Sequence, residues 1–377
     1  MATIIRPSQG MTDTFKDRLA AGRRVLRRHK AHALLLTSPT NVRYVSGFTG
    51  EDSWLLVGRD WGVLLTDGRF TEQAASECRH VEVFTRTRTG RMFEAMKQVL
   101  KGRGVRRLAI EGQHVTVALR QAMEKFFPRM RLVVLGGEMD ALRERKDAGE
   151  LAAIRKAIRA AQRAFKALIS KGAAGLVGRT ENQVAAELEY LMRQMGAARP
   201  SFETIVAAGA HGSMAHYRPG PTKIVRDQAV LIDWGAVVDG YCSDLTRVVF
   251  TGRIPPQIEA VYETVRQAQA AAIKAIGPRV SCGAADAAAR SVIAAAGHGK
   301  AFSHGTGHGL GLEVHESPRL GQKVKQRLAE GMVVTVEPGI YLPGVGGVRI
   351  EDDVLVTSDG ARRLSSLPSA LGDMRLD

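Results

Sequence analysis

The chain has 377 residues, of which 45% are hydrophobic and 24% charged, so it has room for two domains or one large one with the composition of a soluble globular protein. No apolar run is long enough to span a bilayer, and the first residues lack the apolar core and cleavage pattern of a signal peptide. Three cysteines, far apart and without a CxxC pair, imply neither a disulfide framework nor a thiolate metal site. We therefore expect a protein of the reducing cytoplasm.

The net charge of +16 raises the question of a nucleic-acid or membrane-surface partner. The basic residues are spread along the chain, and no nucleic-acid-binding motif accompanies them. Aromatic residues make up only 5%, too few for a base-stacking platform. A solvated basic surface on an enzyme is the simpler interpretation, and we expect neither a specific nucleic acid nor a membrane as partner.

Short apolar runs alternate with helical patterns in the first part of the chain. The expected strands are AHALLLTS (31–38), the pair WLLVG and GVLLTDG as a hairpin around Arg59-Asp60, VEVFTRT, RLAIEG and RLVVLGG. The expected helices cover residues 71–79, 92–100 and 115–127. This alternation predicts an α/β layer with a mixed or parallel sheet, and no glycine-rich phosphate loop follows any of the strands.

The pattern changes near residue 142, where the charged, alanine-rich segment ALRERKDAGELAAIRKAIRAAQRAFKALI is predicted to form one long amphipathic helix. We place a boundary just before this helix, which gives a first domain of residues 1–142 and a second of residues 143–377.

The second domain is expected to combine helices with strands. A helix is predicted to open at Thr180, where Thr-Glu-Asn-Gln forms a capping box, and to stop at Gly196. Two further helices are expected over 257–276 and 284–296, and the stretches around them are rich in strand patterns and glycine turns. The second half is therefore predicted to be α+β, with helices packed on a largely antiparallel sheet.

Two acids lie within the predicted hairpin AVLIDWGAVVDGYCSDLTRVVF. An acid inside an apolar strand, as Asp233 is, costs several kcal/mol unless it is paired. If Asp239-Gly240 forms the turn, Asp233 faces Thr246 and Asp244 faces Gly235 across the hairpin. The two acids are then diagonal neighbours on one face, about 7–8 Å apart, and repel each other unless a cation lies between them.

The segment VTVEPGIYLPGVGGVRIEDDVLV repeats this arrangement. A hairpin centred on Gly344 places Glu337 opposite Glu351, although the proline and glycines of the loop permit bulges. A lone acid of this kind is more often a solvated turn or edge residue. Four acids on two hairpins, each pair sharing a face, favour a metal site.

The segment HGTGHGLGLEVHESP holds three of the ten histidines. His304 and His308 share a face of an extended strand, whereas His315 needs a turn or bulge, which Gly309 and Gly311 could supply. An isolated histidine is usually structural, but three beside a carboxylate site favour metal or substrate binding. One histidine with four carboxylates suits Mn²⁺, with Zn²⁺ and Co²⁺ as alternatives. Four carboxylates exceed the need of one cation and suggest two metals about 3.5–4 Å apart.

These segments resemble the pita-bread (M24) metallopeptidases, the family of aminopeptidase P, prolidase and methionine aminopeptidase. The matches to its Xaa-Pro branch are SPTNVRYVSGFTGEDSWLLV, LLTDGRFTEQA, RPSFETIVAAGAHGSMAHYRP, IDWGAVVDGYCSDLTRVVF, HGTGHGLGLEVHESP and VEPGIYLPGVGGVRIEDDVLVT. The resemblance covers nearly the whole chain. It implies a creatinase-like N-terminal domain of the ribonuclease H-like α/β type and a C-terminal pita-bread domain, an antiparallel sheet with covering helices.

The resemblance also implies roles for individual residues. The implied metal ligands are Asp233, Asp244, His308, Glu337 and Glu351. It implies that His216 and His315 bind substrate and stabilise the tetrahedral intermediate, and that His304 lines the pocket for the proline side. A structural role for His304, bracing the glycine-rich backbone, remains an alternative. Arg349 is implied to support the ligands or to bind the substrate carboxylate, and Glu337 is the candidate proton shuttle.

The implied activity is hydrolysis of the Xaa-Pro bond in dipeptides or at the N-terminus of short peptides, by attack of hydroxide activated by two divalent metal ions. The family also implies a homodimer. Two other classes compete with this interpretation: a non-catalytic relative that binds a partner, and a metal-free amidinohydrolase of the creatinase type. The complete set of five ligands argues against both, because neither needs buried carboxylates that repel one another.

Overall fold

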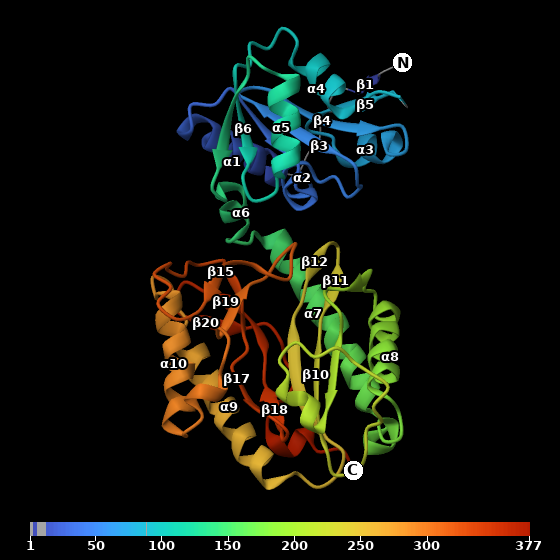
Figure 1. The fold of residues 1–377 in the computed structure, drawn as a ribbon, viewed down its shortest axis with the longest axis vertical. Helices are drawn as coiled ribbons and strands as arrows, with labels where there is room; N and C mark the ends of the chain where they lie inside the picture. The colour runs from blue at the N-terminus through green and yellow to red at the C-terminus, as the bar shows by residue number, and fades with distance from the viewer. Residues whose placement is uncertain (1–2, 6–12, 88) are drawn as a thin grey trace. The chain divides into compact units, whose positions relative to one another are not determined.

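The computed structural model describes residues 3–5, 13–87 and 89–377 (Figure 1). The chain divides into two compact units, Met1–Arg143 and Glu144–Asp377, each with its own hydrophobic core. No helix among the described residues is both long and apolar enough to cross a membrane.

The first unit is built on a mixed sheet, as predicted, with seven strands, of which β1 (Thr3–Ile5) was not expected. Its strands, in sheet order, are β1 (Thr3–Ile5), β5 (Glu82–Arg86), β4 (Gly62–Asp67), β3 (Trp54–Gly58), β2 (Ala33–Leu36), β6 (Arg107–Glu111) and β7 (Arg131–Leu135). The pairs β4–β5, β2–β6 and β6–β7 are parallel and the others antiparallel. Val57 pairs with Gly62, so the predicted hairpin between β3 and β4 is confirmed.

The helices of this unit include three that the periodicity analysis did not anticipate. Those it predicted are α3 (Thr71–Glu77), α4 (Met92–Leu100) and α5 (Val117–Phe126), and those it missed are α1 (Asp13–Arg28), α2 (Pro39–Ser46) and α6 (Glu138–Arg143). The sequence of α2 contains proline, threonine and asparagine, which favour loops. The helix nevertheless begins cleanly because Ser38 caps Asn41 N, and it ends at Gly47 in the left-handed conformation.

The single long helix predicted to follow the domain boundary near residue 142 is wrong at its start, since the chain forms two helices there. The first, α6, ends at Arg143, and α7 (Ala148–Ile169) begins after a break. Asp147 accepts a hydrogen bond from Glu150 N at 2.8 Å, and Glu150 accepts one from Asp147 N at 2.9 Å. This capping box starts a new helix inside a segment whose apolar spacing alone predicts continuity.

The second unit packs two pairs of helices around antiparallel strands, as predicted (Figure 1). Its helices are α7, α8 (Glu181–Gln194), α9 (Pro256–Ala275) and α10 (Cys282–Ala295). Its strands are β8 (Arg199–Pro200), β9 (Ile205–Ala208), β10 (Ala229–Trp234), β11 (Ala236–Val238), β12 (Tyr241–Cys242), β13 (Leu245–Phe250), β14 (Gly307–Gly309), β15 (Glu316–Leu320), β16 (Val333–Val336), β17 (Gly339–Leu342), β18 (Gly346–Arg349), β19 (Asp352–Val356) and β20 (Ala361–Arg363). Every ladder between these strands is antiparallel.

The first acidic hairpin has the register predicted from its turn. Asp239 and Gly240 have φ values of 50° and 80°, and Val238 pairs with Tyr241. The same register continues beyond a bend into β10 and β13, where Asp233 pairs with Thr246. The bend needs a glycine at position 235, because a side chain there would meet the carbonyl oxygen of Ser243 at 2.0 Å.

The second acidic hairpin is built in the same way. Gly339 pairs with Arg349 in the β17–β18 ladder, so the turn is centred on Gly344 as predicted. The β16–β19 ladder continues the same register with Val336 opposite Asp352. Glu337 and Glu351 lie opposite each other in the break between the two ladders. Both hairpins therefore place acids where a continuous ladder bends from one sheet into another.

Candidate metal centre

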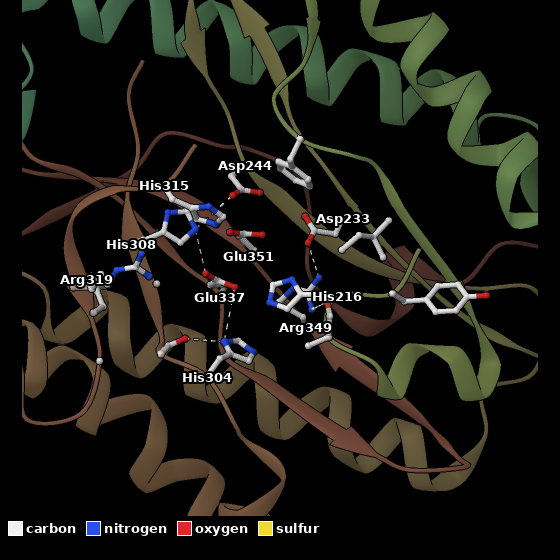
Figure 2. Close-up of a pocket in the computed structure, with 18 of the residues that line it drawn as sticks. His216, Asp233, Asp244, His304, His308, His315, Arg319, Glu337, Arg349 and Glu351 are labelled. Carbon is white, nitrogen blue, oxygen red and sulfur yellow. Dashed lines mark hydrogen bonds and ion pairs between the residues drawn. The ribbon is translucent and has the colours of Figure 1, made fainter. Parts of the chain in front are cut away.

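The two bends lie side by side, which brings the four acids together (Figure 2). An isolated bridge joins Thr246 of the first hairpin to Glu351 of the second, with Glu351 N donating to Thr246 O at 3.2 Å. The neighbour of Asp233, Trp234, is fully buried, stacks on Phe165 of α7 at 4.4 Å, and donates to a backbone carbonyl of that helix. The hairpin is thereby fixed to the helical layer at the residue next to an acid.

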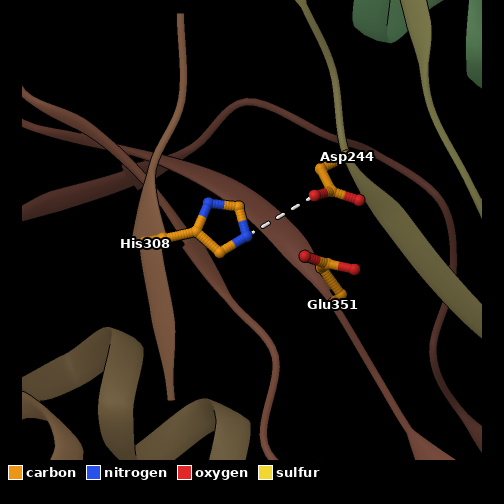
Figure 3. Close-up of side chains that lie close together, drawn as sticks. All are labelled: Asp244, His308 and Glu351. Atoms are coloured by element: carbon orange, nitrogen blue, oxygen red, sulfur yellow. Dashed lines mark ion pairs between the residues drawn. The ribbon is translucent and has the colours of Figure 1, made fainter. Parts of the chain in front are cut away.

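His308 reaches the acids from β14. Its Nδ1 lies 3.0 Å from Gly309 O, and because a carbonyl only accepts, the hydrogen is on Nδ1 and the Nε2 lone pair is free. Nε2 lies 3.6 Å from Asp244 Oδ2 and 3.4 Å from Glu337 Oε1 (Figure 3 shows the approach to Asp244). Burial, together with the neighbouring His315, lowers the pKa of His308 to about 3, so the imidazole is neutral.

The donor set fits a divalent cation. Ligand atoms of Asp244, His308 and Glu351 all lie within 4.8 Å of one another (Figure 3). Oδ1 of Asp233 and Oε1 of Glu351 are buried and accept no hydrogen bond from any described residue. Burial and then repulsion by neighbouring carboxylates raise the pKa of Asp244 and Glu351 well above their ordinary values. Buried acceptors without donors, in a cluster that resists ionisation, are what a bound cation would satisfy.

Several buried side chains hold these ligands, and the sequence patterns did not identify them. Thr246 donates from its hydroxyl to Glu351 Oε2 at 2.7 Å. Asp353 accepts a hydrogen bond from Asp244 N at 3.2 Å, and the hydroxyl of Thr335 accepts one from His308 N at 3.1 Å. The available signals were the position of Thr246 opposite an acid and a second acid, Asp353, in an apolar strand.

Arg349 is buried and largely committed to groups of the protein. It donates to Asp233 Oδ2 at 2.5 Å, to the Thr246 hydroxyl at 3.1 Å and to the Tyr341 hydroxyl at 2.8 Å. A fourth hydrogen bond, of 3.3 Å, goes to Ala215 O. Four of the five guanidinium N–H groups are therefore used. Of the two roles implied by the resemblance, this geometry favours the one that supports the ligands.

The acids and His308 lie in a cavity of about 600 Å³, and all nine residues singled out in the sequence line it. His315 meets the ring of His308 edge-on, with 4.4 Å between ring centroids. His304 is hydrogen-bonded through Nδ1 to Gly305 O and through Nε2 to the Tyr341 hydroxyl, both at 2.8 Å. His304 thus lines the pocket and also braces the backbone. His216 is exposed on the opposite wall (Figure 2).

One cavity residue that the sequence patterns missed is Arg319. Its side chain is exposed, lines the cavity and forms no hydrogen bond or ion pair with any described residue. On the wall that carries His216, Arg218 pairs with Glu203 at 3.4 Å, and both side chains are well exposed. The signal for Arg319 was available, since it lies four residues beyond His315 and directly follows the segment HGTGHGLGLEVHESP.

The bulge between β14 and β15, which lets His315 approach the site, was also expected. The β14–β15 register shifts between His308 and Gly309, which is the bulge predicted to let His315 converge on the other histidines. A side chain at position 309 would meet Ser317 O at 2.2 Å, so only glycine fits.

Comparisons with known proteins agree with this architecture. Residues 152–358 match the model of metallopeptidase family M24, and residues 18–145 match the Creatinase/Prolidase N-terminal domain. The chain is 38% identical to an uncharacterized peptidase, YqhT, of Bacillus subtilis, over 90% of this chain and 94% of the relative.

Two solved structures are similar over almost their whole length. An Xaa-Pro dipeptidase from Bacillus anthracis superposes with a TM-score of 0.91 at 32% identity, covering 96% of this chain and 100% of the other. An X-Pro aminopeptidase from Thermotoga maritima gives a TM-score of 0.84 at 34% identity, covering 92% and 99%. The chain belongs to metallopeptidase family M24, with the pita-bread catalytic fold and a creatinase/prolidase-type N-terminal domain.

Proposed function

We propose that this protein is a dinuclear metallo-exopeptidase that cleaves the Xaa-Pro bond of dipeptides or at the N-terminus of short peptides. The observation that carries the proposal is the convergence of Asp233, Asp244, His308, Glu337 and Glu351 in one cavity that three further histidines also line. The similarity to an Xaa-Pro dipeptidase and an X-Pro aminopeptidase supports the choice of substrate bond.

The five converging residues would hold two divalent ions, with Mn²⁺ as the first candidate and Co²⁺ or Zn²⁺ as alternatives. When bound, the ions supply Lewis acidity and activate water for attack on the peptide carbonyl. Glu337 faces the cavity, and we assign to it the transfer of a proton to the leaving proline nitrogen. To His216 and His315, which line the cavity, we assign hydrogen bonds to the carbonyl oxygen as negative charge develops there.

The Xaa-Pro bond has no N–H, so recognition must come from shape and from the ends of the peptide. His304 lines the cavity and we assign it to the proline side, whereas Arg349 is already occupied within the protein. Arg319 is the cavity cation without a partner among the described residues, and we assign to it the carboxylate of a C-terminal proline. This assignment favours the dipeptide as the better substrate.

The test is an activity assay on metal-stripped protein reloaded with Mn²⁺, Co²⁺ or Zn²⁺, with Ala-Pro, Ala-Pro-Ala and Ala-Ala-Ala as substrates. Metal-dependent cleavage of Ala-Pro alone would identify a dipeptidase. Release of alanine from Ala-Pro-Ala but not from Ala-Ala-Ala would identify an aminopeptidase. If no metal restores cleavage of any proline peptide, the assignment fails, and a binding protein or a metal-free amidinohydrolase takes its place.

The homodimer, the cytoplasmic location and the boundary near residue 142 stay predictions. Sedimentation of the purified protein checks the first of these.

A further inference from the structure

A second buried carboxylate, away from the candidate metal centre, lies behind the wall that carries His216. Glu181 is the first residue of α8 and is fully buried. Its only ion pair among the described residues is with His211. A carboxylate in such a place is costly unless hydrogen-bond donors surround it, although the N-terminus of a helix favours its negative charge.

The donors all come from one segment, residues 208–220. Oε1 accepts from Ala208 N and from His211 Nδ1, both at 2.8 Å. Oε2 accepts from the Tyr217 hydroxyl at 2.7 Å and from Gly220 N at 3.1 Å. The rings of His211 and Tyr217 also stack, with 4.5 Å between their centroids. One carboxylate therefore ties together two distant parts of the same segment.

The tied segment forms a wall of the cavity. Ala215, His216, Tyr217 and Arg218 line the cavity, and the side chain of His216 is exposed in it (Figure 2). Glu181 is hydrogen-bonded to the segment on both sides of His216, at positions 208 and 211 before it and at positions 217 and 220 after it. Arg349 of the candidate metal centre also donates to this stretch, at Ala215 O, over 3.3 Å.

We propose that Glu181 is a positioning residue that sets the placement of His216 at the substrate through these four hydrogen bonds. The inference rests on the proposed function for the role of His216, but the restraint on the segment is a separate property. Glu181 does not contact the five candidate ligands, so its loss should leave metal binding intact. It should misplace His216, and a misplacement of about 1 Å can lower the rate about 100-fold.

The informative variant is Glu181→Gln. Glutamine keeps one acceptor oxygen, and its amide N–H groups would face the N–H groups of the segment where the second oxygen was. The matched control is Glu189→Gln, the same change on the same helix at a half-exposed side chain that forms no hydrogen bond with the described residues. Hydrogen exchange of residues 208–220, metal content, and kcat and KM on Ala-Pro are measured for both.

In Glu181→Gln we expect amide exchange in residues 208–220 to speed up at least about tenfold, because either Ala208 N or Gly220 N, which bond to different carboxylate oxygens, loses its acceptor. We expect kcat/KM to fall about 10- to 100-fold, mainly through kcat, with unchanged metal content. In a His216→Ala background the same change should alter activity less than about twofold, because it acts through the missing ring. If Glu181→Gln destabilises the fold, Tyr217→Phe removes one of the four bonds and should give a smaller change in the same direction.

Two results would overturn the inference. One is exchange in residues 208–220 that matches the Glu189→Gln control. The other is an equal loss of activity with and without His216, which would mean a general effect on the fold. Hydrogen exchange is measured whether or not the protein cleaves proline peptides. An inactive wild type would therefore contradict the proposed function, while the exchange result would still decide whether Glu181 restrains the segment.

Discussion

The protonation of single side chains in the candidate metal centre depends on how much it costs to bury their charge. Asp244 and Glu351 are 5% and 1% exposed, and each lies close to other carboxylates. Burial and repulsion hold their pKa values high, so without a cation they keep protons that ligands must lose. The same residues that would bind metal therefore weaken the metal-free protein. A change that removes one of them should affect activity and stability in opposite directions.

We expect Asp244→Asn to abolish Xaa-Pro cleavage and the thermal shift that added Mn²⁺ produces, because one candidate ligand is lost. Without metal the variant should melt no lower than the wild type, since folding no longer buries a carboxyl group whose pKa desolvation and neighbouring carboxylates raise. Thermal melts with and without Mn²⁺ measure both effects. Asp239→Asn is the matched control, because Asp239 is in the exposed turn of the same hairpin and asparagine tolerates its φ of 50°.

The three cysteines give a prediction that depends on pH. Burial raises the pKa of Cys78 and Cys242 to about 12 and that of Cys282 to about 11. The thiolate is the reactive form, so at pH 8 the three buried thiols should react slowly with a disulfide reagent. Three equivalents should react quickly once denaturant unfolds the chain. Fast reaction of the native protein at pH 8 would contradict the burial of these side chains.

At the scale of elements, the hairpins were predictable where the turn fixes the register. Asp239-Gly240 and Gly344 are strong turn signals, and counting residues from them placed all four acids correctly. The break between α6 and α7 was not predicted, because helical periodicity continues across it and only the capping box of Asp147 interrupts it. Contacts between distant segments, such as those of Glu181 and Asp353, leave no periodic trace in the sequence.

An ion pair within helix α10 also supports the site. Asp286 is 1% exposed and pairs with Arg290, four residues later, which the sequence alone would suggest is a surface ion pair. Asp286 accepts hydrogen bonds from the backbone N and the hydroxyl of Thr306, at 3.1 and 2.9 Å. Thr306 O in turn accepts from Glu337 N, and Arg290 donates to His304 O at 2.8 Å.

We expect Asp286→Asn to lower stability by about 1–3 kcal/mol, because buried donors lose a charged acceptor. It should also reduce kcat/KM, since His304 and Glu337 lie on the segments that this pair restrains. Denaturant unfolding and steady-state kinetics give the two quantities. Glu263→Gln on α9 removes an exposed pair with Arg266 and should change stability by less than about 1 kcal/mol. Equal effects of the two variants would show that the buried Asp286 contributes no more to stability than an exposed ion pair does.

The molecule as a whole consists of two units with separate cores, and all the candidate ligands belong to the second. Anything that binds the native state and not the unfolded chain stabilises the unit that contains the site. Bound metal should therefore raise the melting temperature of the second unit and leave that of the first unchanged. The first unit, whose sheet core includes Leu35, Leu56 and Leu108, has no share in the cluster.

Removal of metal by a chelator should abolish activity and lower the melting temperature of the second unit. With free metal at 100 times its dissociation constant, the stabilisation is about 2.7 kcal/mol. Calorimetry with and without chelator measures the shift, and re-addition of Mn²⁺ should reverse it. A chelator that leaves both activity and melting unchanged would argue for the metal-free amidinohydrolase.

The continuous register of the two bent hairpins limits how the length of this chain can change over evolutionary time. Each acid reaches its place by a count of residues from the bend, and a shift of one residue turns a side chain to the opposite face. An insertion of one residue between Asp233 and the bend, or between Glu351 and its own bend, would turn that acid away from the site even though its residue type is unchanged. Length differences among relatives should therefore gather at the tips, around Asp239 and Gly344, where added residues leave the spacing of the acids untouched.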